Sequence, residues 1–162
     1  MVLVIGNGLV GRSISSALVA EGHDVWVSCR NSSVVEGAQQ APPLQGDMLK
    51  SPTIKPRQIY FAPFLFGSME GSALKSVLDE MLRGGELDNL ESITLCSSAS
   101  VYGRPMSINI TEVHETRPES AYGAYKLCEE MLFRELSQKL KTKLLIARPA
   151  TIYGFSGNTV ST

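Results

Sequence analysis

The sequence predicts one α/β domain over residues 1–162, built as a doubly wound parallel sheet with helices on both faces. Short runs of aliphatic and β-branched residues recur along the chain, as expected of strands buried on both sides of a parallel sheet. Segments with helical spacing of apolar residues separate these runs. Of the 162 residues, 43% are hydrophobic and 19% are charged, which is typical of a single globular domain.

The first 30 residues predict a strand, a helix and a second strand. Residues 2–5 form an uninterrupted apolar run, residues 9–21 have apolar positions near helical spacing, and residues 25–27 return to a strand pattern. Gly22 stands where a glycine commonly ends a helix. This order of elements is a βαβ unit.

The remaining elements are predicted in the same way. Helical spacing predicts helices over residues 72–83 and 121–140, the second offering Cys128, Met131, Leu132, Leu136 and Leu140 for one buried face. Four further strands are predicted, over residues 44–47, 58–62, 92–96 and 143–147. Strands that alternate with helices favour right-handed crossovers and a parallel sheet.

A glycine-rich loop joins the first strand to the first helix and matches the pattern G-x-G-x-x-G. The first glycine permits a tight turn, the second lets the backbone approach a pyrophosphate, and the third permits close contact between helix and strand. The free N–H groups and the dipole at the helix start attract the diphosphate. The predicted dinucleotide-binding residues of this Rossmann-type loop are Gly6, Gly8, Leu9, Val10 and Gly11. The alternative is a tight turn that binds no ligand.

The end of the second strand indicates which dinucleotide binds. An acidic residue at this position commonly contacts the adenosine ribose of NAD, whereas this chain has Ser28, Cys29 and Arg30 followed by Asn31 and Ser32. A guanidinium and nearby hydroxyls suit a 2′-phosphate, so NADP is favoured over NAD. The alternative is an ordinary solvated arginine at the end of a strand.

Tyr122 and Lys126 are four residues apart on a predicted helix, so their side chains project from one face. A tyrosine with its ordinary pKa of about 10 is a poor base at neutral pH, but a neighbouring ammonium stabilises the phenolate. Such a pair can move a proton on or off a sugar-type hydroxyl. The alternative is a surface tyrosine beside a solvated lysine.

Two more motifs follow predicted strands: residues 97–103 (S-S-A-S-V-Y-G) and residues 148–154 (R-P-A-T-I-Y-G). Together with the glycine loop, Tyr122 and Lys126, they resemble the short-chain dehydrogenase/reductase superfamily, in particular its extended branch, the NAD-dependent epimerase/dehydratase family. The resemblance implies that Ser98 hydrogen-bonds the reacting oxygen, that Tyr122 is the acid/base, and that Lys126 holds the nicotinamide ribose.

The same resemblance assigns two further cofactor contacts and a reaction. It implies that Asp47 contacts the adenine and that Pro149 lines the nicotinamide pocket. The expected activity is hydride transfer at a hydroxyl or carbonyl of a nucleotide-sugar or related small molecule. The G-x-G-x-x-G spacing and residues 60–63 instead resemble atypical members, some of which bind NADP without clear catalysis. A non-catalytic NADP(H)-binding or sensor module is therefore the alternative function.

Composition excludes several other classes of partner. A net charge of −1 argues against nucleic acid, no apolar run approaches the roughly 20 residues that span a membrane, and the histidines lack metal-ligand spacing. The three cysteines are expected to be buried and reduced, which predicts a cytoplasmic protein. Extended members continue beyond the sixth strand into a substrate-binding domain. We therefore expect a fragment or truncated chain that forms a homo-oligomer or binds a complementing chain.

Overall fold

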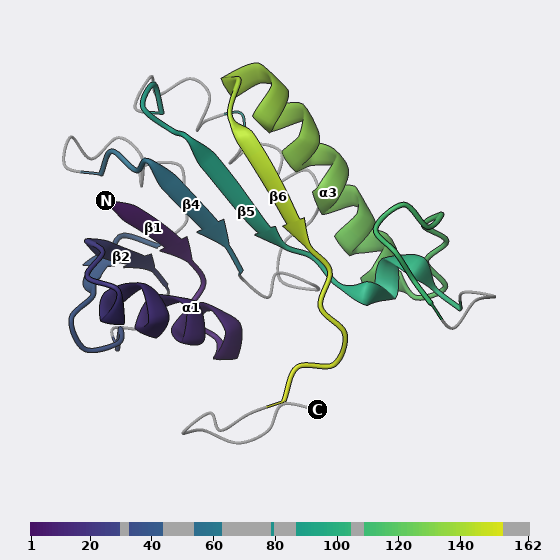
Figure 1. Ribbon diagram of the computed structural model, residues 1–162, viewed down its shortest axis with the longest axis horizontal. Coiled ribbons are helices and arrows are strands. Elements are labelled where there is room, and N and C mark those ends of the chain that lie inside the picture. Colours follow the sequence, from purple (N-terminus) through teal and green to yellow (C-terminus); the bar gives the residue numbers. More distant parts are fainter. Residues whose placement is uncertain (30–32, 44–53, 63–78, 80–86, 105–108, 154–162) are drawn as a thin grey trace.

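The computed structural model describes residues 1–29, 33–43, 54–62, 79, 87–104 and 109–153 (Figure 1). Two predicted cofactor contacts, Arg30 and Asp47, lie outside the described residues. So do the strand predicted over residues 44–47 and the helix predicted over residues 72–83, of which only Asp79 is described.

The described elements are strands and helices, and they begin with the predicted strand–helix–strand order. In chain order they are β1 (Val2–Ile5), α1 (Leu9–Ala20), β2 (Val25–Ser28), β3 (Gln39–Ala41), β4 (Gln58–Phe61), β5 (Ser92–Cys96), the 3₁₀ helix η2 (Ala99–Tyr102), α3 (Ala121–Leu140) and β6 (Lys143–Ala147).

The six strands form one parallel sheet in the order β3-β2-β1-β4-β5-β6 (Figure 1). This is the order of a Rossmann sheet, which confirms the predicted fold class. The order in which strands are added reverses between β1 and β4, because β2 and β3 lie on one side of β1 and the later strands on the other. Val2 pairs with Val25 of β2 and with Gln58 of β4. Ligands of such sheets bind beyond the carboxyl ends of the strands at this reversal.

The sheet contains a strand that the sequence did not predict, β3, which lies at residues 39–41 beside β2. Gln39 and Gln40 are exposed and Ala41 alone is buried, as befits a strand at the edge of the sheet. A polar edge strand has no apolar run, so the hydrophobic pattern of the sequence could not reveal it.

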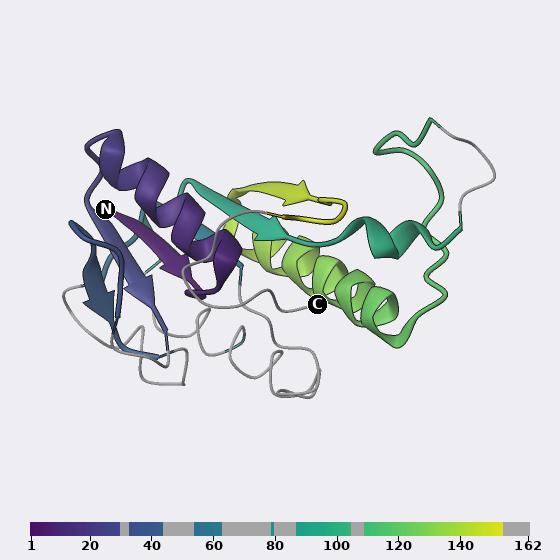
Figure 2. The same cartoon turned by 90° about the horizontal axis from the view of Figure 1, so that it is seen from below.

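Helices cover both faces of the sheet, with α1 on one side and α3 on the other (Figure 2). Alternate residues of β1 point into the two layers, so Val2 and Val4 pack with α1 while Leu3 and Ile5 join the layer under α3. In the second layer the rings of Phe61 and Phe133 lie 4.7 Å apart at 51°. Because β1 is buried on both faces, its sequence reads as one continuous apolar run.

Helix α3 has the predicted bounds and part of the predicted buried face, because Leu132, Leu136 and Leu140 pack in the core layer. Leu136 is buried as expected, whereas Cys128 is exposed and the Met131 side chain is 64% exposed. The buried face carries Lys126, Glu129 and Glu130 beside its apolar residues. The prediction was wrong because it assigned only apolar residues to the core, whereas these charged side chains are buried against polar partners.

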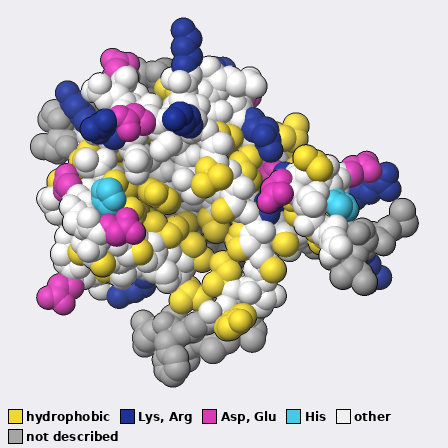
Figure 3. All heavy atoms as spheres, viewed as in Figure 1, with side chains coloured by type: hydrophobic (Ala, Val, Ile, Leu, Met, Phe, Trp, Pro, Cys, Tyr) yellow, Lys and Arg dark blue, Asp and Glu magenta, His cyan; other side chains and the backbone are white. Residues whose placement is uncertain are grey.

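The exposed surface includes Leu145 on the outer side of β6 and one of the three cysteines, Cys128. Leu145 of β6 is 62% exposed, and hydrophobic side chains gather over the middle of the face seen in Figure 3. Cys29 is buried, Cys96 is partly buried and Cys128 is exposed, so the expectation of three buried cysteines is wrong for Cys128. Within the described residues, no helix is long and apolar enough to cross a membrane, and no three His, Cys, Asp or Glu side chains form a metal-binding group.

Candidate active site

Two glycines of the loop after β1 are required by the conformation and packing of the backbone. Gly6 has φ +107°, a conformation that side chains rarely adopt, and its N–H donates to Ser28 O at 2.9 Å. A Cβ atom at Gly11 would lie 2.0 Å from Gly6 O. Gly11 therefore permits the close contact between α1 and the end of β1 that the sequence predicted.

Neither backbone conformation nor packing requires a glycine at Gly8. Its φ of −75° suits any residue, and a Cβ atom placed there would meet nothing within 4 Å. Gly8 precedes α1 without a side-chain cap, and no acidic residue occupies the first turn. The N–H groups of Leu9 and Val10 open this helix, where N–H groups lack intrahelical partners. The open space and these donors fit the diphosphate of a dinucleotide.

Polar side chains join this loop to the segment that follows β2. Asn7 Nδ2 donates to Ser33 O at 2.5 Å, and Arg12 Nη1 donates to the same oxygen at 3.2 Å. Ser28 Oγ is buried and donates to Pro42 O at 2.7 Å. The Ser28 hydroxyl is thus occupied within the fold, which removes it from the hydroxyls expected to face a 2′-phosphate.

Ser98 lies just beyond the carboxyl end of β5 and begins η2. Its Oγ accepts a hydrogen bond from Ser100 N at 3.1 Å and donates to Ser100 Oγ, also at 3.1 Å. The segment from β6 runs alongside, because Ala99 N donates to Pro149 O at 2.8 Å. Two of the predicted site residues, Ser98 and Pro149, are therefore neighbours.

Helix α3 contacts the η2 segment at a glycine, Gly123. A Cβ atom at Gly123 would lie 2.5 Å from Ser100 O, so only a glycine lets the first turn of α3 contact η2 this closely. Ser120 caps the helix by accepting a hydrogen bond from Gly123 N at 3.0 Å. Tyr122, half-buried, precedes this glycine and is thereby held near the Ser98 segment.

Lys126 is 5% exposed, which rules out a solvated lysine. Its ammonium donates to Cys96 O at 3.1 Å, at the end of β5, and to Glu129 Oε2 at 2.7 Å. An ammonium has three N–H groups, so these two bonds fix the direction of the third. Ser98, Tyr122 and Lys126 thus come from β5 and α3 to one end of the sheet.

Glu129 was not identified from the sequence, although its carboxylate contacts the predicted catalytic lysine. Burial raises the pKa of Glu129, and the nearby Lys126 opposes that rise. Burial and the same carboxylate raise the pKa of Tyr125 to about 12. Burial also raises the pKa of the Cys96 thiol. A carboxylate three residues after Lys126 on the same helix was the available signal.

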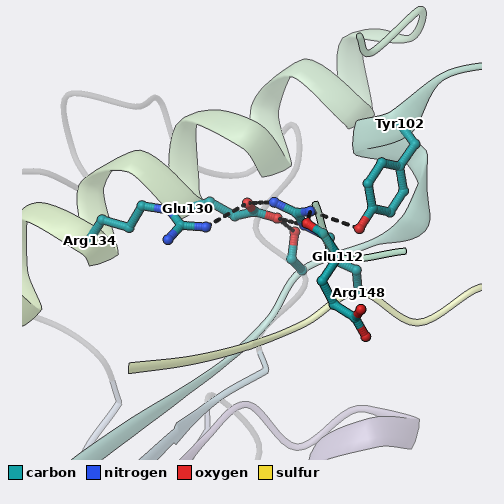
Figure 4. A network of polar contacts seen from close by, with 6 residues as sticks. Tyr102, Glu112, Glu130, Arg134 and Arg148 are labelled. Atoms are coloured by element: carbon teal, nitrogen blue, oxygen red, sulfur yellow. Dashed lines mark hydrogen bonds and ion pairs between the residues drawn. The ribbon is translucent and has the colours of Figure 1, made fainter. Parts of the chain in front are cut away.

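Glu130 forms a second buried ion pair, which the sequence also did not reveal. Arg148 donates to both carboxylate oxygens of Glu130, at 2.8 and 2.6 Å, and Ser97 donates to one of them at 2.6 Å (Figure 4). Arg148 also donates to the hydroxyl of Tyr102 at 2.8 Å and to Glu112 O at 3.4 Å. This network joins β5, η2, α3 and the segment after β6.

The pKa of Glu130 reflects these partners. Burial acts to raise it, but the hydrogen bonds from Arg148 and Ser97 outweigh burial, and the pKa lies below its ordinary value. The Arg148 guanidinium also lies 4.9 Å from the centre of the Tyr102 ring. The buried charge of Glu130 is thus held by the planar guanidinium of Arg148, which donates to both carboxylate oxygens.

A comparison with known families matches the C-terminal part of this arrangement. The profile of the NAD dependent epimerase/dehydratase family matches residues 74–161, just over half of the chain. The chain belongs to the NAD-dependent epimerase/dehydratase family. The match includes Ser98, Tyr122, Lys126 and Pro149, while the glycine loop lies before it.

Individual relatives of this epimerase/dehydratase-family chain are longer proteins. Uncharacterized protein y4nG of Sinorhizobium fredii is 32% identical over 91 residues, which are 56% of this chain and 22% of the relative. UDP-N-acetylglucosamine 4-epimerase from Bacillus cereus has a similar fold, with a TM-score of 0.80 and 18% identity over 99% of this chain and 56% of its own.

A short-chain dehydrogenase/reductase superfamily protein from Agrobacterium tumefaciens, solved with bound NAD, has a TM-score of 0.74 at 23% identity, over 91% of this chain and 48% of its own. UDP-glucose 4-epimerase from Brucella ovis, solved in complex with NAD, has a TM-score of 0.72 at 19% identity, over 91% of this chain and 50% of its own. The epimerase/dehydratase-family chain thus spans about half the length of these solved structures.

Proposed function

We propose that the chain is the dinucleotide-binding part of an oxidoreductase that acts by hydride transfer on a hydroxyl or carbonyl of a nucleotide-sugar or related substrate. The observation that carries this proposal is the approach of Ser98, Tyr122 and Lys126 to one end of β5. Lys126 is anchored on Cys96 O, and Gly123 allows α3 to contact the η2 helix that Ser98 begins.

Each residue has a distinct role in this proposal. Tyr122 moves the proton of the reacting hydroxyl, and the positive charge of Lys126 stabilises its phenolate. Ser98 orients the reacting oxygen, and the remaining N–H of Lys126 contacts the nicotinamide ribose. The nicotinamide, when bound, supplies the hydride acceptor or donor. Gly6, Gly8, Leu9, Val10 and Gly11 hold the diphosphate, and Pro149 borders the nicotinamide.

The proposed cofactor is NADP rather than NAD, because the sequence after β2 offers Arg30 and no acidic residue. Asp47 is proposed to contact the adenine. Replacing Arg30 by Ala should weaken NADPH binding while leaving NADH binding near its original strength. Equal loss of both dinucleotides would contradict the role of Arg30 at a 2′-phosphate.

The nucleotide-sugar class rests on the names of structurally similar proteins, which include UDP-N-acetylglucosamine 4-epimerase and UDP-glucose 4-epimerase. These likenesses are at 18% and 19% identity, so they support the substrate class without selecting a sugar. We also propose that the chain pairs with a second copy or a complementing chain, since Leu145 leaves an apolar side of β6 exposed. A monodisperse monomer by size exclusion with light scattering would contradict that pairing.

Gly8→Ala tests dinucleotide binding directly. The added Cβ atom meets no atom of the chain, so the melting temperature should fall only by the small amount expected for alanine in place of glycine before a helix. The same Cβ atom would occupy the space where the diphosphate approaches. We expect roughly tenfold weaker NADPH binding, equivalent to about 1.4 kcal/mol, measured by energy transfer from Trp26. Ser16→Ala, an exposed change farther along α1, is the matched control. Unchanged affinity in Gly8→Ala would refute the diphosphate site.

A non-catalytic NADP(H) sensor is the second candidate function. It is favoured by one observation, the pairing of Lys126 with Glu129, which offsets the charge that would activate Tyr122. Incubation of the protein with UDP-sugars and either dinucleotide, followed by NMR of the sugars, separates the two functions. Turnover that disappears in Tyr122→Phe supports the enzyme, and dinucleotide binding without turnover of any sugar supports the sensor.

A further inference from the structure

A buried carboxylate lies directly against the lysine that the proposed reaction uses. The Glu129 side chain is 0% exposed and the Lys126 side chain is 6% exposed, and their charged atoms are 2.7 Å apart. Because the pair is shielded from water, its interaction is not screened as an exposed ion pair would be. The charge of Lys126 is therefore balanced before any ligand binds.

The groups around Glu129 come from two elements. On α3 it faces Lys126 and the phenol of Tyr125, and across the interface it faces the Cys96 thiol of β5. The next carboxylate, Glu130, is held separately by Arg148 and Ser97. Glu129 Oε1 is buried and has no hydrogen-bond partner among the described residues. The Glu129 carboxylate therefore accepts fewer hydrogen bonds than that of Glu130.

The position of this pair relative to Tyr122 determines its effect. Glu129 lies seven residues after Tyr122 on α3, about 10 Å along the helix axis. Lys126 lies between them, one turn from Tyr122. Tyr122 therefore experiences a lysine whose positive charge is partly cancelled by the carboxylate behind it.

We propose that Glu129 is a positioning residue that anchors the ammonium of Lys126 and reduces the positive charge felt by the phenol of Tyr122. The inference rests on the proposed roles of Tyr122 and Lys126. In this arrangement the bonds to Glu129 and Cys96 O also direct the third N–H of Lys126.

Glu129→Gln tests the inference, because the amide keeps an acceptor for Lys126 and removes the charge. The pKa of Tyr122 is measured by NMR of protein labelled with ¹³Cζ-tyrosine, and Tyr122→Phe assigns the signal. We expect the pKa of Tyr122 to fall in Glu129→Gln, because removing a negative charge near the phenol favours the phenolate.

Three further variants separate charge from structure. Glu129→Asp keeps the charge and should leave the pKa of Tyr122 near its original value. Glu135→Gln removes an exposed carboxylate from the same helix, where it pairs with Lys139, and should leave that pKa unchanged. Glu129→Leu removes the charge without an amide and should lower the pKa of Tyr122 as Glu129→Gln does.

Several results would overturn the inference. These are an unchanged pKa of Tyr122 in both neutral variants, an equal fall in Glu135→Gln, or a chain that folds with neither Gln nor Leu at this position, which would make Glu129 purely structural. NADPH titration of the same proteins tests the proposed function separately. Failure of all of them to bind would refute dinucleotide binding and leave the pKa of Tyr122 to decide the role of Glu129.

Discussion

Two adjacent glutamates of α3 are both 1% exposed, yet their pKa values are shifted in opposite directions. Glu129 receives one ionic hydrogen bond, from Lys126, and burial raises its pKa. Glu130 receives two from the Arg148 fork and one from Ser97, and these outweigh its burial. The number and geometry of donors, rather than depth alone, decide how a buried carboxylate behaves.

The two ion pairs also differ in what they hold together. Arg148 follows β6 and, through Glu130 and Tyr102, connects α3 with η2 (Figure 4). The Lys126–Glu129 pair lies within one helix turn and contacts β5 at Cys96, through the bond from Lys126 to Cys96 O. The first pair therefore braces the fold, whereas the second lies next to the residues proposed to react.

The largest expected effect on stability comes from removing the Arg148 guanidinium that pairs with Glu130. Arg148→Met leaves the buried Glu130 with a hydrogen bond from Ser97 and with Arg134 at 3.9 Å. We expect the free energy of unfolding to fall by about 3 kcal/mol. Urea denaturation monitored by circular dichroism measures it. Arg57→Met breaks the exposed ion pair with Glu91 and serves as the control, with an expected loss below about 1 kcal/mol. Equal losses in the two variants would mean that burial adds nothing to the Glu130 pair.

A smaller effect is expected from the other pair. Lys126→Met removes the cation beside Glu129, but this carboxyl already has a raised pKa and becomes neutral more readily than Glu130. We expect the free energy of unfolding to fall by about 1.5 kcal/mol at pH 7, in the same urea assay. A loss larger than that of Arg148→Met would reverse the order assigned to the two glutamates.

The smallest effect is the dependence of stability on pH, which should have opposite signs for the two residues. Glu130 has a pKa below its ordinary 4.5, so its contribution is present above that pH and is lost as the pH falls through its folded value. Glu129 has a pKa above 4.5, so its contribution is full below that pH and is lost as the pH rises through its folded value.

Urea titrations between pH 3 and 8 would reveal both contributions. Each unit of pKa shift corresponds to about 1.4 kcal/mol. Glu130→Gln should flatten the loss of stability in acid, and Glu129→Gln should flatten the decline above pH 4.5. Slopes of the same sign for the two residues would contradict the assigned shifts.

Local patterns in the sequence predicted most of the fold. The apolar run at β1, the glycine loop and the capped helix α3 each depend on residues close together in the chain, and all lie where expected. The strand β3 was missed because its glutamines give no apolar run. The motif spacing also placed Ser98, Tyr122 and Lys126 on elements that converge at one end of β5.

The charged contacts could not be predicted in the same way. Glu130 and Arg148 are 18 positions apart in the sequence, and Lys126 meets Cys96 O across 30 positions. No periodicity distinguishes these side chains from solvated charges on a helix surface. The buried face predicted for α3 was wrong at Met131 for this reason, since Met131 is exposed while Glu129 and Glu130 are buried.

The sequence by itself determined the order of elements, the conformational need for Gly6 and the residue types at the proposed site, because these follow from backbone sterics and local hydrophobic spacing. Only the tertiary structure decided which charged side chains are buried and which residues they pair with. Such pairs form between distant segments, and their energy depends on exclusion of water and on donor geometry, which exist only after the sheet and α3 have packed together.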